Sequence, residues 1–77
     1  MPTAFVCITT DPASIVEVLK ELKGIKGVEE AEMVYGIYDI IVKVKAGSID
    51  SLKKIITKKI RKIKKVTTTT TIIVEKA

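Results

Sequence analysis

The spacing of apolar residues divides the chain into six blocks that each fit a strand or a helix. Alternation predicts strands over residues 3–10, 28–35, 37–46 and 66–74. In the first block, Ala4, Val6 and Ile8 point one way, and Phe5 and Cys7 point the other. Apolar residues on both faces are typical of a central strand that is covered on both sides.

The remaining two blocks, residues 11–23 and 49–63, have the spacing and the ends of amphipathic helices. Asp11 can cap the first free amides, Pro12 suits the first turn, and Gly24 can end the helix. Ser48 is placed to cap the second helix. The apolar stripes expected to face the sheet are Ile15, Val18, Leu19 and Leu22 in the first helix, and Ile49, Leu52, Ile56, Ile60 and Ile63 in the second.

The stretch V-Y-G-I-Y-D-I-I-V-K-V, residues 34–44, predicts a tight turn at Gly36 followed by the most apolar strand. Alternation places Tyr38 on the face that is predicted to hold Ile40, Val42, Val44 and Ala46. The opposite face carries Ile37, Asp39, Ile41, Lys43 and Lys45. The carboxylate of Asp39 begins an apolar strand, so it needs a partner if it is buried.

The predicted order is β-α-β-β-α-β, which is typical of the ferredoxin-like α+β fold. We expect a four-stranded antiparallel sheet with both helices on one face and with the first and third strands at its centre. Glu29, Glu30 and Glu32 suit an edge position for the second strand. The helices leave the other sheet face apolar and open, so a two-fold dimer through this face is the simplest way to cover it.

Length and composition narrow the class of protein. The 77 residues make one domain, residues 1–77, and a chain this short buries only about 60–65% of its unfolded surface, so a partner chain would help it. No membrane span or signal peptide is visible, so we expect a cytoplasmic protein. The chain has one Cys and no His, which excludes an internal disulfide and removes the commonest general base and metal ligand. We therefore expect no cofactor, no metal and no catalysis, while the Lys and Glu content hints at a thermophile.

Several motifs together resemble the effector-binding domain of the Lrp/AsnC regulators, called the RAM domain. They are A-F-V-C-I (4–8), K-G-V-E-E (26–30), Y-G-I-Y-D-I-I-V-K-V (35–44) and I-K-K-V-T-T-T-T-T-I-I-V (63–74). The resemblance covers nearly the whole chain, and it rests on Gly-x-Tyr-Asp and Thr-x-Thr at this separation. Regulators of this family carry an N-terminal helix-turn-helix before the domain. Because nothing precedes the first strand here, the chain resembles a stand-alone form, for which direct, sequence-specific DNA binding is not expected.

The resemblance implies a homodimer, assembled further into a ring of dimers, with a small amino acid bound between dimers. Carried over by position, the ligand-binding residues are Gly36, Ile37, Tyr38, Asp39, Thr69 and Thr71. Asp39 would pair with the α-ammonium of the ligand, and the threonines would supply hydroxyls. Where the family commonly has a polar or acidic residue, this chain has Ile37, which implies either an apolar ligand or none. The domain would regulate transcription by assembling with itself or with a full-length Lrp/AsnC regulator.

Each candidate residue also has a purely structural interpretation. Asp39 can be a carboxylate that stabilises the turn or a subunit contact. The run Thr67–Thr71 can reflect the preference of β-branched residues for strands. Tyr35 and Tyr38 can be core or interface aromatics.

The second helix has a basic face, which suggests an alternative function as a nucleic-acid-binding module. Lys53, Lys54, Lys58, Lys59, Arg61 and Lys62 form it, and Lys64 and Lys65 continue it. With a net charge of +5, these residues would attract phosphate. No aromatic residue interleaves with them, so no platform for base stacking is visible and a solvated charged face is the simplest interpretation. Gly24–Gly27 matches the GxxG of KH domains, but a strand with three glutamates follows, so we interpret it as a turn.

Overall fold

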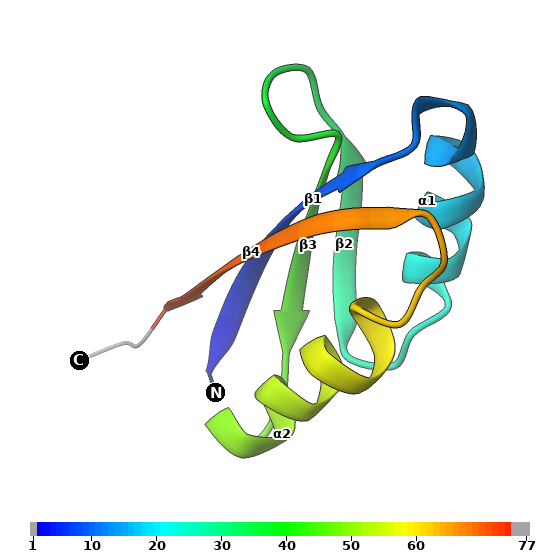
Figure 1. The fold of residues 1–77 in the computed structure, drawn as a ribbon. Helices are drawn as coiled ribbons and strands as arrows, with labels where there is room; N and C mark the ends of the chain where they lie inside the picture. Colours follow the sequence, from blue (N-terminus) through cyan, green and yellow to red (C-terminus); the bar gives the residue numbers. More distant parts are fainter. Residues whose placement is uncertain (1, 75–77) are drawn as a thin grey trace.

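The computed structural model describes residues 2–74, which form one four-stranded sheet with helices beside it (Figure 1). The strands are β1 (Thr3–Thr10), β2 (Val28–Met33), β3 (Ile40–Lys45) and β4 (Val66–Val74). The helical elements are a 3₁₀ turn η1 (Pro12–Ser14), α1 (Ile15–Lys23), α2 (Ile49–Ile55) and a π-helical segment η2 (Ile56–Ile60).

The sheet has the strand order β2-β3-β1-β4, and every neighbouring pair is antiparallel. This confirms the ferredoxin-like α+β fold and the central position of β1 and β3. The register pairs Val6 with Val42 on one side and with Thr71 on the other. The acidic strand β2 lies at an edge, as its charges predict.

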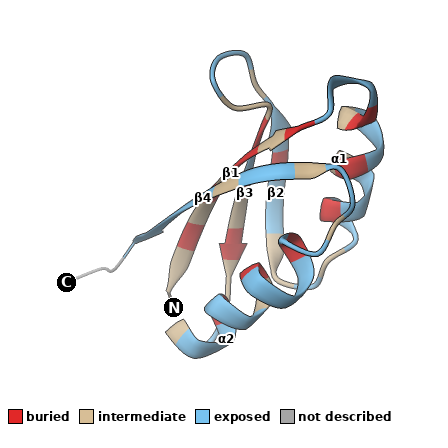
Figure 2. Cartoon of the chain, viewed as in Figure 1, coloured by how far each residue is buried: buried red, intermediate tan, exposed pale blue. Residues whose placement is uncertain are grey.

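The core lies between one face of the sheet and the helices, which both cover that face (Figures 1 and 2). Alternate residues of the two central strands are fully buried there, as the sequence predicts. They are Ala4, Val6, Ile8, Ile40, Val42 and Val44. The helices contribute Val18, Leu22, Leu52, Ile56 and Ile60, while Ile15, Leu19 and Ile63 pack at the margin. Of the predicted helix stripes, only Ile49 lies outside this cluster.

The two predicted caps are present. The carboxylate of Asp11 accepts a hydrogen bond from the backbone N–H of Ala13, and the hydroxyl of Ser48 accepts one from Ser51. After α1, the chain turns through Gly27, whose φ is +101°. A Cβ there would lie 2.7 Å from Cδ1 of Ile55 and 3.2 Å from the carbonyl oxygen of Lys45. Gly27 therefore lets the start of β2 pass close beneath α2.

The structure corrects two boundaries. Strands β2 and β3 are not joined by a tight turn at Gly36, because β2 ends at Met33 and β3 begins at Ile40. The second helix was expected as far as Ile63, but it ends at Ile60 and its last five residues are π-helical. Ile56 and Ile60, the first and last residues of this segment, are both buried.

Candidate functional site

The loop over residues 34–39 stands out from the end of the sheet (Figure 1). Its base is closed by a 2.9 Å hydrogen bond from the backbone N–H of Val34 to the carbonyl oxygen of Asp39. Gly36 has φ of +142°, which a residue with a side chain rarely adopts, and space around it is open. At the tip, Tyr35 and Ile37 are almost wholly exposed. Two large exposed apolar side chains on a projecting loop suggest a surface that another molecule covers.

Asp39 joins this loop to the end of β1. Its Oδ2 accepts a 2.8 Å hydrogen bond from the backbone N–H of Thr10, and its own N–H donates to the carbonyl oxygen of Ile8. The side chain is half-buried. Among residues 2–74, no hydrogen bond or ion pair involves the other carboxylate oxygen, Oδ1. Asp39 therefore has a structural contact and still has an acceptor to offer a ligand.

Tyr38 does not lie where alternation predicts, on the face of Ile40. Its hydroxyl donates a 3.1 Å hydrogen bond to the hydroxyl of Thr70. Thr70 is paired with Cys7, and directly opposed residues of an antiparallel pair share a face. Tyr38 therefore reaches across the open face of the sheet. The prediction failed because Tyr38 precedes β3 and is not bound by the alternation of a strand.

Thr69 and Thr71 lie on the other face, because they are paired with Ile8 and Val6. Thr69 is half-buried and Thr71 is exposed. The backbone N–H of Asp39 bonds to Ile8 from one side of β1, and Thr69 is paired with Ile8 on the other side. Their backbones are therefore about two strand spacings, roughly 10 Å, apart. Thr69 also lines a shallow hollow of about 290 Å³, together with Arg61, Val66, Thr67 and Thr68.

Within one chain, the six predicted ligand residues are divided among four places. Gly36 and Ile37 are at the loop tip, Asp39 is at the end of β1, Tyr38 extends over the open face, and the threonines lie on the edge strand. Thr10 and Thr70, which contact Asp39 and Tyr38, were not predicted. The only signal for Thr10 was its place at the end of a central strand, where its N–H needs a partner beyond the sheet.

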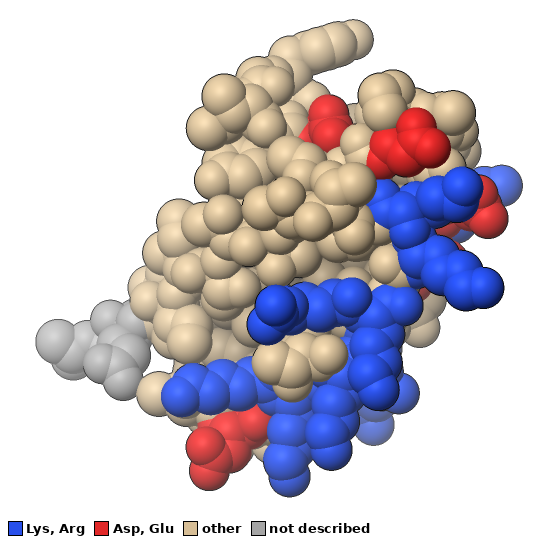
Figure 3. Space-filling view, viewed as in Figure 1, with Lys and Arg blue, Asp and Glu red and all other residues tan. Residues whose placement is uncertain are grey.

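The basic residues of the second helix all lie on the surface. Figure 3 shows Lys and Arg side chains gathered over α2 and the segment that follows it. In the described part of the chain, the ion pairs join Lys43 and Lys45 to Glu29 at 3.8 and 3.6 Å, and none reaches residues 49–65. No three His, Cys, Asp or Glu residues within 2–74 are grouped as a metal site would need. No helix in the same range has the length and apolar character needed to cross a membrane.

Solved structures of similar fold include proteins of different length. A hypothetical protein from Pyrococcus horikoshii is 39% identical, with a TM-score of 0.93, and the match covers 100% of this chain and 93% of that one. AsnC from E. coli is 30% identical, with a TM-score of 0.90, over 99% of this chain and 52% of that one. A feast or famine regulatory protein from M. tuberculosis, solved with L-methionine, is 27% identical, with a TM-score of 0.81. That match covers 100% of this chain and 52% of the regulator.

The chain thus spans about half the length of AsnC and of the M. tuberculosis regulator. A comparison with curated proteins found no match. The family model of the Lrp/AsnC ligand binding domain matches residues 3–77, which is nearly the whole sequence. The chain therefore belongs to the Lrp/AsnC ligand-binding domain family.

Proposed function

We propose that this domain binds a small apolar amino acid at a junction between dimers and thereby regulates transcription. It would do so by changing its own assembly, as a ring of dimers, or by assembling with a full-length Lrp/AsnC regulator. The role is non-catalytic. The family match over residues 3–77 supports a regulatory effector-binding domain, and the geometry around Asp39 supports the location of the ligand.

The observation that carries the proposal is the state of the Asp39 carboxylate. Oδ2 is fixed by the N–H of Thr10, which holds the side chain in one orientation. Oδ1 makes no hydrogen bond within residues 2–74, and the group is half-buried. An oriented carboxylate with a remaining acceptor is suited to an α-ammonium group, because such a bond is charge-assisted.

The remaining half of the pocket is expected from another chain. The loop tip exposes Tyr35 and Ile37, and neither contacts Asp39 through a hydrogen bond. A loop of a second dimer placed against this tip would cover the apolar side chains and enclose a ligand beside Asp39. The apolar character of Ile37 favours a ligand with an apolar side chain.

The dimer itself would form through the open sheet face. That face carries Phe5 and Cys7 from β1, Ile41 from β3, and Ile72 from β4, as the strand register shows. Ile72 is 55% exposed and Ile41 is 36% exposed. Apolar groups on the flat outer face of a sheet are commonly covered by a second copy related by a two-fold axis.

One of the related structures, the M. tuberculosis regulator, holds L-methionine, which is a small amino acid with an apolar side chain. That protein is 27% identical to this chain, which supports testing amino acids with apolar side chains first. Methionine, leucine, isoleucine and valine are accordingly the leading candidates for this chain.

The experiment is a thermal melt of the protein with each of the twenty amino acids in turn. A ligand that binds only the folded state at about 100 times its dissociation constant stabilises it by about 2.7 kcal/mol, which raises Tm by several degrees. Asp39→Asn should abolish this rise, whereas the matched variant Asp50→Asn, on α2, should retain it. A Tm indifferent to all twenty amino acids would contradict the proposal, as would an unchanged response in Asp39→Asn.

A further inference from the structure

Charge is divided very unevenly along this chain. Residues 49–65 hold eight of the 14 Lys and Arg residues but only one of the nine Asp and Glu residues. That segment therefore has a formal charge of +7 and the rest of the chain −2, which together give the net +5. A surface with interspersed signs would be the ordinary arrangement for a solvated helix. The segregation here suggests a polyanionic partner.

The structure places these cations on one surface and leaves them without internal partners. Leu52, Ile56 and Ile60 face the core, so the basic residues of α2 and η2 point outward. All eight basic residues are exposed: Lys53, Lys54, Lys58, Lys59, Arg61, Lys62, Lys64 and Lys65. Over residues 2–74, none of them makes an ion pair. Within the described chain, no ion pair therefore offsets their mutual repulsion.

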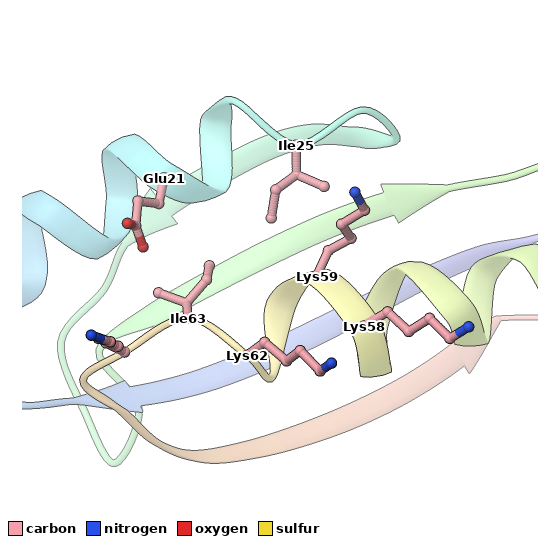
Figure 4. Close-up of a pocket in the computed structure, with 7 residues that line it drawn as sticks. Glu21, Ile25, Lys58, Lys59, Lys62 and Ile63 are labelled. Atoms are coloured by element: carbon pink, nitrogen blue, oxygen red, sulfur yellow. The ribbon is translucent and has the colours of Figure 1, made fainter.

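Two hollows on this surface can each receive an anionic group. The first, about 520 Å³, lies between the end of α1 and η2 (Figure 4). Ile25 and Ile63 point toward one another across it, and lysine side chains extend from its η2 side. Four of its seven lining residues are basic: Lys58, Lys59, Lys62 and Lys64. The only acidic one is Glu21.

The second hollow combines Arg61 with the hydroxyl-bearing residues Thr67, Thr68 and Thr69. Guanidinium groups and hydroxyls are, with lysines, the side chains that most often donate hydrogen bonds to phosphate oxygens. Arg61 and Lys62 are consecutive, so both hollows border the same short segment of the chain. A polymer of regularly spaced phosphates could fill both.

The composition of this surface indicates which polyanion it fits. The exposed large apolar residues of the described chain all lie outside 49–65, so nothing there would insert into a lipid bilayer. No aromatic residue lies in that segment either, which removes the stacking platform that single strands need. The surface therefore offers a ligand only positive charges and hydroxyl groups, which suit phosphates. Duplex DNA presents phosphates in a dense row, with about one charge per 1.7 Å of its axis.

We propose that the basic face, residues 53–65 of α2, η2 and the following turn, binds the phosphate backbone of double-stranded DNA without reading its sequence. This surface lies on the helix-covered side of the sheet, opposite the open face proposed for the dimer (Figure 1). Dimerisation would leave it accessible, and each added copy would add another basic face. The basic residues of this face include none of the six predicted ligand residues, although Thr69, which lines the second hollow, is one of the six.

The experiment measures fluorescence anisotropy of a labelled DNA duplex with the full chain, over a series of salt concentrations. Lys58→Gln/Lys59→Gln/Lys62→Gln removes three charges from the basic face. The matched control, Lys20→Gln/Lys23→Gln/Lys26→Gln, removes three charges from α1 and the turn after it. Both triple variants lower the net charge by the same amount. A difference in their DNA affinity therefore reports where the removed charges lie and not the total charge of the protein. Circular dichroism verifies that each variant is folded.

The unmodified protein should bind duplexes of unrelated sequence alike and lose affinity steeply with salt. The basic-face variant should lose on the order of a hundredfold in affinity at about 0.1 M salt, and its salt slope should fall by about three units. The control should change affinity by only a few fold. The proposal is overturned if no duplex binds at low salt, if both variants weaken binding equally, or if only single strands or anionic vesicles bind.

Discussion

The Oδ2 atom of Asp39 accepts a 2.8 Å hydrogen bond from the backbone N–H of Thr10. The two residues are 29 positions apart, and the bond ties the loop before β3 to the end of β1. Asp39 thus has a structural contact as well as a proposed ligand contact. The two roles use different oxygens of one carboxylate, so they can be separated by substitution.

The stability of Asp39 variants distinguishes these roles. Asp39→Ala leaves the N–H of Thr10 without its partner and should lower the free energy of unfolding by about 1–3 kcal/mol. Asp39→Asn keeps an acceptor for that N–H and should lower it by less than about 1 kcal/mol. Urea denaturation measures both values. If both variants lost the same large amount of unfolding free energy, the negative charge of Asp39, and not only its acceptor oxygen, would be needed for stability.

The open sheet face should be the dimer interface. Ile72→Glu places a charge on this face, so it should convert a dimer to a folded monomer. The matched control is Val16→Glu, because Val16 is a similarly exposed apolar residue, at 60% against 55% for Ile72, but it lies on α1. Sedimentation velocity gives the mass of each variant. A dimer that survives Ile72→Glu would place the interface elsewhere.

Gly27 should be the glycine most sensitive to substitution. Gly27→Ala forces a side chain into φ of +101° and to within 3.2 Å of the carbonyl oxygen of Lys45, and should cost about 2 kcal/mol or more. Gly47→Ala is the control, because a Cβ there meets nothing within 4 Å, and it should change stability by less than about 0.5 kcal/mol. Thermal melting compares the stability of the two variants with that of the unmodified protein. Similar small effects would mean that the start of β2 can shift away from α2.

The ion pairs of Glu29 should contribute little to stability. Its carboxylate lies 3.8 Å from Nζ of Lys43 and 3.6 Å from Nζ of Lys45, and all three side chains are between 32% and 43% exposed. Water and salt screen such pairs, so Glu29→Gln should change the free energy of unfolding by less than about 0.5 kcal/mol. A loss above about 1 kcal/mol that disappears at high salt would contradict this.

The sequence predicted most of the fold because most of it depends on local spacing. The alternation of Ala4, Val6 and Ile8 identified a central strand, and the caps at Asp11 and Ser48 marked the helix starts correctly. The π-helical turn at Ile56–Ile60 was missed, since the apolar spacing there fits an ordinary helix equally well.

The candidate site was harder to predict because its contacts join distant parts of the chain. Thr10 and Asp39 meet only after β1 and β3 pair, and Tyr38 reaches Thr70 across the face of β1. The geometry of the loop between Met33 and Ile40 follows from these contacts, which cannot be predicted from the spacing of residues along the chain. A ligand pocket shared between chains depends in addition on a partner surface, which the sequence of one chain does not describe.

Molar mass from light scattering after gel filtration, with and without methionine, leucine, isoleucine or valine, tests the central claim most directly. The measurement is made at low and moderate salt, so that charge-driven association is recognised. We expect a dimer or a larger assembly whose mass changes when one of these amino acids is present. A monomer of constant mass in every condition would contradict both the dimer and the amino-acid-dependent assembly.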